Sequence, residues 1–247
     1  MASRSPPDGY ERRLTILADH FADRTTSKDA AERLASLTLE EKPETGLNMT
    51  WGSIITIARE SGHHLEKLAN VLVEMTKLPP AKDENGEQLM LYGLRIWGMD
   101  LPTELSARQK AINNFTNINK LAALLTRSGA TLFSSFDLFA IWTMRSALET
   151  PAYKDLDAFI PAAAAWITVL GSEMYSWDRE FPYGDKHGDP GKGGELWEGQ
   201  YGPCRERWQF WRRRFGDLSM SDRLTNDLRG IAKDAEAQMA AIEADTR

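Results

Sequence analysis

The stretches that decide the fold are LFSSFDLFAIWTMRSALE (132–149) and DAFIPAAAAWITVLGSEMYSW (157–177). Apolar residues in both recur at helical spacing and lie nearly all the way round the helix rather than along one side. A helix that is apolar all round is stable only where neighbouring elements cover it on every side. We therefore expect these two helices to form the centre of the core.

The rest of the chain also has helical periodicity. Apolar residues recur at spacings of three and four along 63–78, and further helices are expected over 10–24, 27–40, 47–61, 106–127, 203–215 and 221–245. Ser27 is the expected N-cap of the second helix, and Ser106 with Gln109 indicates a capping box. No long stretch alternates as a strand does. The sequence predicts an all-α, single-domain multi-helix bundle over 1–247, with residues 1–9 as a flexible tail.

Composition narrows the class of protein. The net charge of −6 disfavours nucleic acid and anionic membrane surfaces as partners. Cys204 is the single cysteine, which excludes an internal disulfide and a multi-cysteine metal site. MASRSPPDGYERR (1–13) lacks the apolar stretch of a signal peptide, and the longest apolar run, 159–170, is too short to span a bilayer. We expect a cytoplasmic protein that binds no membrane.

The segment WDREFPYGDKHGDPGKGGELWEG (177–199) is unusually rich in glycine and aromatic residues. It is not a phosphate-binding loop, because Gly193 stands where serine or threonine is needed. It is not an EF-hand, because counting from Asp185 places Pro190 at the glycine position. Its aromatic rings are costly to leave in water, so we expect an ordered long loop over 177–202. Such a loop is either a lid over a site or a purely structural connection.

The segment CRERWQFWRRRF (204–215) places Cys204, Trp208, Trp211 and Phe215 on one apolar helix face. Arginines flank this face. One interpretation is a surface that binds planar anions such as carboxylate or phosphate groups. The other is a core-facing helix whose arginines pair with carboxylates of the same chain.

Three other features favour structural roles. His63 and His64 are adjacent, so they point in different directions on a helix, and no metal site is predicted. In AINNFTNINK (111–120), Asn113 and Asn117 share a face, where they either line a polar pocket or bond to neighbouring helix termini. Cys204 is expected to behave as a small buried hydrophobe. The sequence predicts no cofactor.

The segments WDREFPYG (177–184), LWEGQYGPCRERWQFWRRRFG (196–216) and WGMDLP (97–102) resemble a family of fungal proteins classed as a domain of unknown function. This resemblance implies a helical protein of about this length and a fungal origin. It implies no assigned activity and therefore provides no catalytic residues.

Three functional hypotheses remain. The first is a binding or interaction protein that contacts a small molecule or a protein through region 177–215, with the candidate residues Trp177, Tyr183, Trp197, Arg205, Arg207 and Trp208. The second is an enzyme of small-molecule metabolism, secondary metabolism included, whose pocket is covered by loop 177–202. Its acid–base candidates are Asp178, Glu180 and His187. The third is a homodimer formed through the apolar stripe of the C-terminal helix.

Overall fold

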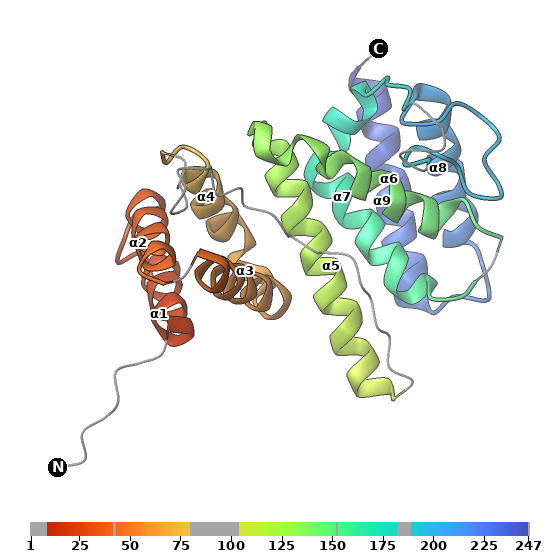
Figure 1. Cartoon of the computed structure of the whole chain (residues 1–247). Coiled ribbons are helices and arrows are strands. Elements are labelled where there is room, and N and C mark those ends of the chain that lie inside the picture. Colours follow the sequence, from red (N-terminus) through yellow and green to blue (C-terminus); the bar gives the residue numbers. More distant parts are fainter. Residues whose placement is uncertain (1–8, 42, 80–103, 152, 182–188, 247) are drawn as a thin grey trace. The chain divides into compact units, whose positions relative to one another are not determined.

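The computed structural model describes residues 9–41, 43–79, 104–151, 153–181 and 189–246. The chain groups into two compact units, Met1–Asp100 and Leu101–Arg247. All regular structure in the described residues is helical (Figure 1), which confirms the all-α prediction. Two compact units can still unfold together as one cooperative domain. The single domain over 1–247 therefore stays a prediction. Among the described helices, none is long and apolar enough to cross a membrane.

The described part of the first unit packs four α-helices around a small aliphatic core. In chain order these are α1 (Gly9–Phe21), α2 (Ser27–Leu39), α3 (Pro43–Glu60), the 3-10 turn η1 (Gly62–His64) and α4 (Leu65–Met75). Helix α2 contacts each of the other three helices. Leu17, Leu34, Ile54 and Leu68 are completely buried. The apolar stripe expected over 63–78 is therefore the inner face of α4.

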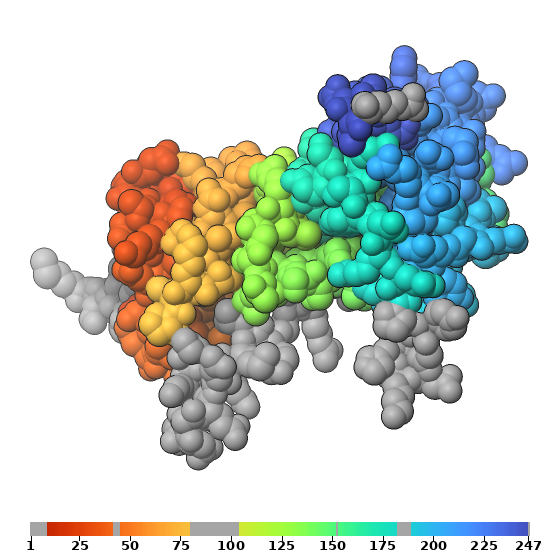
Figure 2. Space-filling model, turned by 90° about the horizontal axis from the view of Figure 1, so that it is seen from above, coloured from red at the N-terminus to blue at the C-terminus, as the bar shows by residue number. Residues whose placement is uncertain are grey.

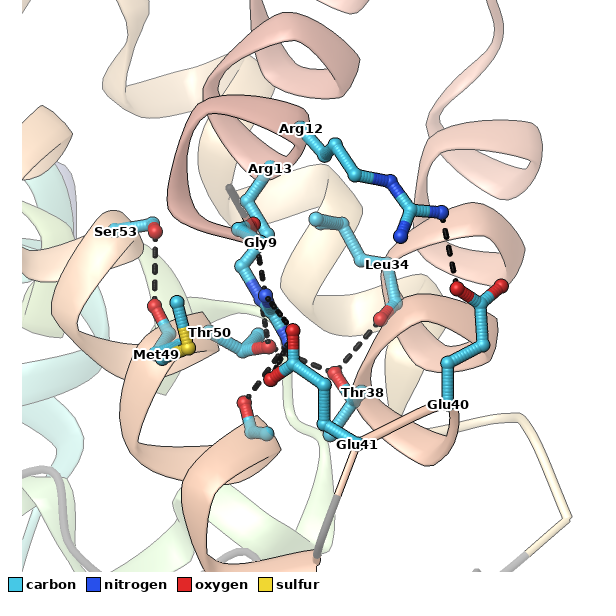
Figure 3. Close-up of polar contacts among 11 residues, drawn as sticks. Gly9, Arg12, Arg13, Leu34, Thr38, Glu40, Glu41, Met49, Thr50 and Ser53 are labelled. Atoms are coloured by element: carbon cyan, nitrogen blue, oxygen red, sulfur yellow. Dashed lines mark hydrogen bonds and ion pairs between the residues drawn. The ribbon is translucent and has the colours of Figure 1, made fainter. Parts of the chain in front are cut away.

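A buried arginine joins three segments of this unit (Figure 3). Arg13 is 0% exposed. Its Nε donates to Thr50 Oγ1 (2.7 Å), and its terminal nitrogens donate to Gly9 O (2.8 Å), Gly46 O (3.2 Å) and both carboxylate oxygens of Glu41 (3.2 and 3.3 Å). The guanidinium thus connects α1 to the start of α3 and to the segment that leads into it.

The N-cap of α2 differs from the prediction. Thr26, not Ser27, is the capping residue: its backbone is extended, and its side chain accepts from the amide of Asp29. The Asp29 side chain in turn accepts from the Thr26 amide, which completes a capping box. The cap therefore lies one residue before the predicted one, because this reciprocal pair needs an acidic residue three positions after the cap.

The N-cap of α5 (Leu105–Arg127) was also predicted wrongly. Ser106 lies inside the helix and forms no capping box with Gln109. Glu104 is the cap, and its carboxylate accepts from the amides of Ser106 (3.2 Å) and Ala107 (2.8 Å). The carboxylate can reach these first-turn amides, and its negative charge is favourable at a helix N-terminus.

The second unit is built around α7 (Leu156–Ser176). The other elements are α5, the 3-10 helix η2 (Thr131–Phe136), α6 (Asp137–Leu148), α8 (Arg205–Ser219) and α9 (Asn226–Asp245). Helix α7 packs against α5, α6, α8 and α9, with α5 and α9 running beside it (Figure 1). Its central Trp166 and Ile167 are completely buried, as the apolar sequence predicts. The helix predicted over 132–149 starts as η2 and becomes α-helical only at Asp137.

One buried amide connects three helices of this unit. Asn119 Oδ1 of α5 accepts from Thr143 Oγ1 of α6 (2.8 Å) and from Trp166 Nε1 of α7 (2.8 Å). Its Nδ2 donates to Phe115 O (3.0 Å). The asparagine-rich stretch therefore contributes a structural bond inside the core, while Asn113 lies exposed at the surface.

The apolar stripe of the C-terminal helix packs inside the second unit. Ala235 and Met239 of α9 are buried, and α9 packs against both α7 and α8. Glu243 of α9 is buried and accepts from Trp208 Nε1 (3.1 Å) and Arg212 Nη1 (2.7 Å). The inner part of this stripe is thus covered by the chain's own helices.

Candidate functional site

The predicted binding region contains a completely buried ion pair. The side chains of Glu149, at the end of α6, and Arg207, in α8, are both 0% exposed. Arg207 Nε donates to Glu149 Oε1 (2.7 Å), and Nη2 donates to Oε2 (2.9 Å). Trp211 Nε1 donates to Oε1 (2.6 Å), and the amide of Gly194 donates to Oε2 (2.7 Å). Each oxygen of the buried carboxylate therefore accepts two hydrogen bonds.

The remaining donors of Arg207 hold the backbone of the glycine-rich loop. Its Nη1 donates to Gly191 O (2.8 Å) and Gly202 O (3.0 Å), and its Nη2 also donates to Lys192 O (3.3 Å). Arg207 is thus occupied by a carboxylate and carbonyls of its own chain. This arrangement favours the core-facing interpretation of this arginine over direct contact with a ligand.

Glycine is required in this loop because the backbone approaches its neighbours too closely for a side chain. A Cβ on Gly194 would lie 2.5 Å from the carbonyl oxygen of Glu149. Gly202 has a φ of +117°, and a Cβ there would lie 2.1 Å from Arg179 O. The abundance of glycine in 177–202 therefore has a packing explanation in the described part of the loop.

Replacing Gly194 by alanine is expected to detach the loop from Glu149 and to lower the free energy of unfolding by about 1–3 kcal/mol, since the backbone opposite cannot move away. Hydrogen exchange measured by mass spectrometry should show faster exchange over residues 189–203. Gly230→Ala in α9 is the control, because no atom lies within 4 Å of the added Cβ. It should leave exchange in the loop unchanged. Unchanged exchange in Gly194→Ala would contradict the packing explanation.

Three contacts of Trp197 fix the outer side of the loop. The ring of Trp197 packs against Phe210 of α8, with 5.5 Å between centroids, and the Arg207 guanidinium carbon lies 5.8 Å from the Trp197 centroid. Trp197 Nε1 donates to Gln200 O (3.1 Å). Trp197 is partly exposed, so its ring forms part of the molecular surface above the buried pair.

The two ends of the loop are paired with each other. The amide of Arg179 donates to Pro203 O (3.1 Å), and the amide of Phe181 donates to Tyr201 O (2.8 Å). The Arg179 guanidinium also forms an ion pair with Asp137, the first residue of α6. Burial raises the pKa of Asp137 even though the charge of Arg179 opposes this shift.

The other predicted ligand-binding residues lie in different environments. Trp208 is buried, and its Nε1 donates a hydrogen bond to Glu243. Arg205 is exposed and stacks over the Tyr175 ring, with 4.5 Å between the guanidinium carbon and the centroid. Trp177 is partly exposed directly after α7. The candidate Tyr183 lies outside the described residues.

The acid–base candidates are not brought together with a nucleophile in the described residues. Asp178 and Glu180 are exposed. The third candidate, His187, lies outside the described residues. Cys204 is buried, and burial raises the pKa of its thiol, so it resembles a structural cysteine more than a nucleophile. In the part of the chain described, no group of three metal-ligating side chains comes together.

Sequence reasoning missed an exposed apolar surface that includes the outer side of α8. Three of its members rank among the exposed large hydrophobic residues: Leu196 (38% exposed), Tyr153 (39%) and Met220 (80%). Trp197 and Phe210 are partly exposed, and Arg213 is exposed. We call these residues the α8 face: Tyr153, Leu196, Trp197, Phe210, Arg213 and Met220.

Hydrogen bonds hold the three segments of the α8 face next to one another. The Leu196 amide donates to Glu149 O (3.0 Å), and Arg214 Nε of α8 donates to Leu148 O (3.0 Å). Ser221 Oγ, directly after α8, lies 3.5 Å from the Tyr153 hydroxyl. Figure 2 shows the loop residues after 189 and the helices that follow (blue shades) as adjoining surface. Helical spacing of 210, 213 and 220 could have indicated this face, but no sequence pattern relates Tyr153 to it.

The sequence matches one family, described as "Protein of unknown function (DUF3632)", over residues 51–215. This segment contains Glu149, Arg207 and the whole glycine-rich loop. No curated protein and no solved structure matches the chain. The predicted resemblance to a family of unknown function is confirmed, while the fungal origin stays a prediction.

Proposed function

This chain belongs to the DUF3632 family of proteins of unknown function, and we propose that it is a binding protein that contacts a protein partner through the α8 face. The observation that carries the proposal is the exposure of Leu196, Tyr153 and Met220, together with the partly exposed rings of Trp197 and Phe210, on segments that hydrogen bonds hold next to one another. Exposed apolar clusters of this kind are typical of interaction sites.

The composition of the α8 face supports a protein partner. Aromatic residues, methionine and arginine are enriched where proteins meet, and the face contains all three. Its central cation, Arg213, makes no ion pair with any described residue. The partner we propose presents apolar side chains to Leu196 and Phe210 and a carboxylate to Arg213.

The buried pair beneath the face supports the proposal energetically. Glu149 and Arg207 fix the loop backbone that presents Leu196 and Trp197, so these side chains need little ordering when a partner binds. Rigid presentation lowers the entropic cost of association. The pair therefore has a positioning role, while the exposed side chains make the contact.

Leu196→Asp is expected to weaken binding of the isolated partner by about tenfold or more, because a charge enters the apolar contact. The partner is first captured by a photo-crosslinking amino acid at position 210, and its affinity is then measured by calorimetry. Leu132→Asp is the matched control: Leu132 is 43% exposed on η2 and lies outside the α8 face. Equal affinity for both variants would overturn the proposal, whatever protein was captured.

The same measurements separate the other hypotheses. Light scattering on the purified chain tests the homodimer hypothesis. A dimer formed through the C-terminal helix would double the measured mass, and Leu196→Asp would leave that mass unchanged. The enzyme hypothesis stays a prediction and requires turnover that depends on Asp178, Glu180 or His187. Turnover that is insensitive to Leu196→Asp, with no partner found, would replace the binding proposal.

A further inference from the structure

Arg145 of α6 is a partly buried arginine whose side chain holds the glycine-rich loop but forms no ion pair with a described residue. It is partly exposed, and its Nη1 donates to Lys192 O (3.2 Å) at the protein surface. Among the described residues, no carboxylate lies within ion-pair distance of its guanidinium. By contrast, Arg207, Arg212 and Arg214 each form an ion pair.

The charges around Arg145 do not balance. The acidic group whose charge acts on Arg145 is Glu149, one turn further along, and both its oxygens are already occupied by Arg207, Trp211 and the Gly194 amide. Burial lowers the pKa of Arg145. The attraction of Glu149 opposes this shift, and the weaker repulsion from Arg207 adds to it. The cluster thus holds two arginines and one carboxylate, which leaves a partly desolvated positive charge in reach of solvent.

The loop backbone beside Arg145 is fixed from the same side of α6. Trp142, three residues earlier, donates from its Nε1 to Pro190 O (2.8 Å). Arg145 holds the next part of the loop through Lys192 O, and the Lys192 side chain is exposed. The guanidinium therefore has a defined position, with unused donors and a second cationic residue close by in the loop.

We propose that Arg145 anchors a binding site for the carboxylate or phosphate group of a small molecule, at the junction of α6 with residues 190–194. The planar guanidinium presents paired N–H donors that match two oxygens of such an anion. Lys192 adds a positive charge. A bound anion neutralises the excess charge of the cluster. This site lies outside the α8 face and does not depend on the proposed function.

The test measures thermal unfolding of the full chain at constant ionic strength, while chloride is replaced by inorganic phosphate or by succinate. The wild-type melting temperature is expected to rise with at least one of these anions, because ligands that bind only the folded state stabilise it. The phosphate and succinate arms identify which anionic group is preferred. If neither anion raises the melting temperature, the proposal is overturned.

Arg145→Gln is expected to abolish this rise in melting temperature. It should also lower the affinity for the anion, measured by calorimetry, by about tenfold or more, because a charge-assisted hydrogen bond is lost. Arg229→Gln is the control, because Arg229 of α9 lies outside both proposed sites and its partner Asp222 is 100% exposed. It should keep the wild-type response. Lys192→Gln alters only an exposed side chain, so the variant folds. It is expected to lower the affinity for the anion. A full response in both Arg145→Gln and Lys192→Gln would overturn the site.

Discussion

Replacing Arg207 by methionine is expected to lower the free energy of unfolding by about 3–5 kcal/mol, the largest effect of any single change considered. The substitution leaves Glu149 completely buried without its counter-ion. Three loop carbonyls that accept from Arg207 also lose their donor. Denaturant unfolding of the full chain, followed by circular dichroism, measures the loss.

Two control variants separate the buried charge from the lost side chain. Glu149→Gln combined with Arg207→Met removes both charges, so it should recover part of the stability lost in the single variant. Arg229→Met removes a surface arginine whose partner Asp222 is 100% exposed, and it should change stability by less than about 1 kcal/mol. A double variant less stable than Arg207→Met would show that the uncompensated carboxylate is not the cause.

Replacing Arg13 by methionine is expected to cost about 2–4 kcal/mol in the first unit. Arg13 is as deeply buried as Arg207, and its loss removes the donor to Gly9 O, Gly46 O and Thr50 (Figure 3). The cost is smaller than for Arg207 because the Glu41 side chain is 23% exposed, so water can solvate the carboxylate left behind.

Hydrogen exchange is the suitable measurement for Arg13→Met, because it reports each unit by itself. Amides of α1 and α3 should exchange faster, while those of α7 keep their protection. The neighbouring Arg12→Met is the control: Arg12 pairs with Glu40 at the surface, where the two side chains are 47% and 53% exposed. If Arg12→Met increased exchange as much as Arg13→Met, burial of Arg13 would not explain its role.

Helical periodicity was sufficient to predict the class of fold. Apolar residues all round 157–177 indicated a central helix, and α7 contacts four other helices of its unit. Capping was predicted less well, since Ser27 and Ser106 both carry favourable side chains but lie inside their helices. A cap depends on backbone conformation as well as on residue type, and several neighbouring residues compete for it.

The glycine-rich loop shows which contacts a local sequence pattern can predict and which it cannot. Its aromatic residues predicted an ordered loop, and in the described part Trp197 packs against Phe210 of the helix that follows. Glu149 contacts both the loop backbone and Arg207, yet it precedes Arg207 by 58 positions in the sequence. In the sequence Glu149 is merely the last residue of a predicted helix. Nothing in its surroundings distinguishes it from an ordinary exposed glutamate.

The sequence by itself determined that the chain is helical and which stretches are central, because amphipathic and all-round apolar patterns are properties of neighbouring residues. Only the tertiary structure decided which arginines lie inside and which stay available. Arg207 and Arg213 belong to the same short run, yet one is buried against Glu149 and the other is exposed. The physical reason is that an arginine is stable in the interior only where distant parts of the chain supply a carboxylate and carbonyls for its donors.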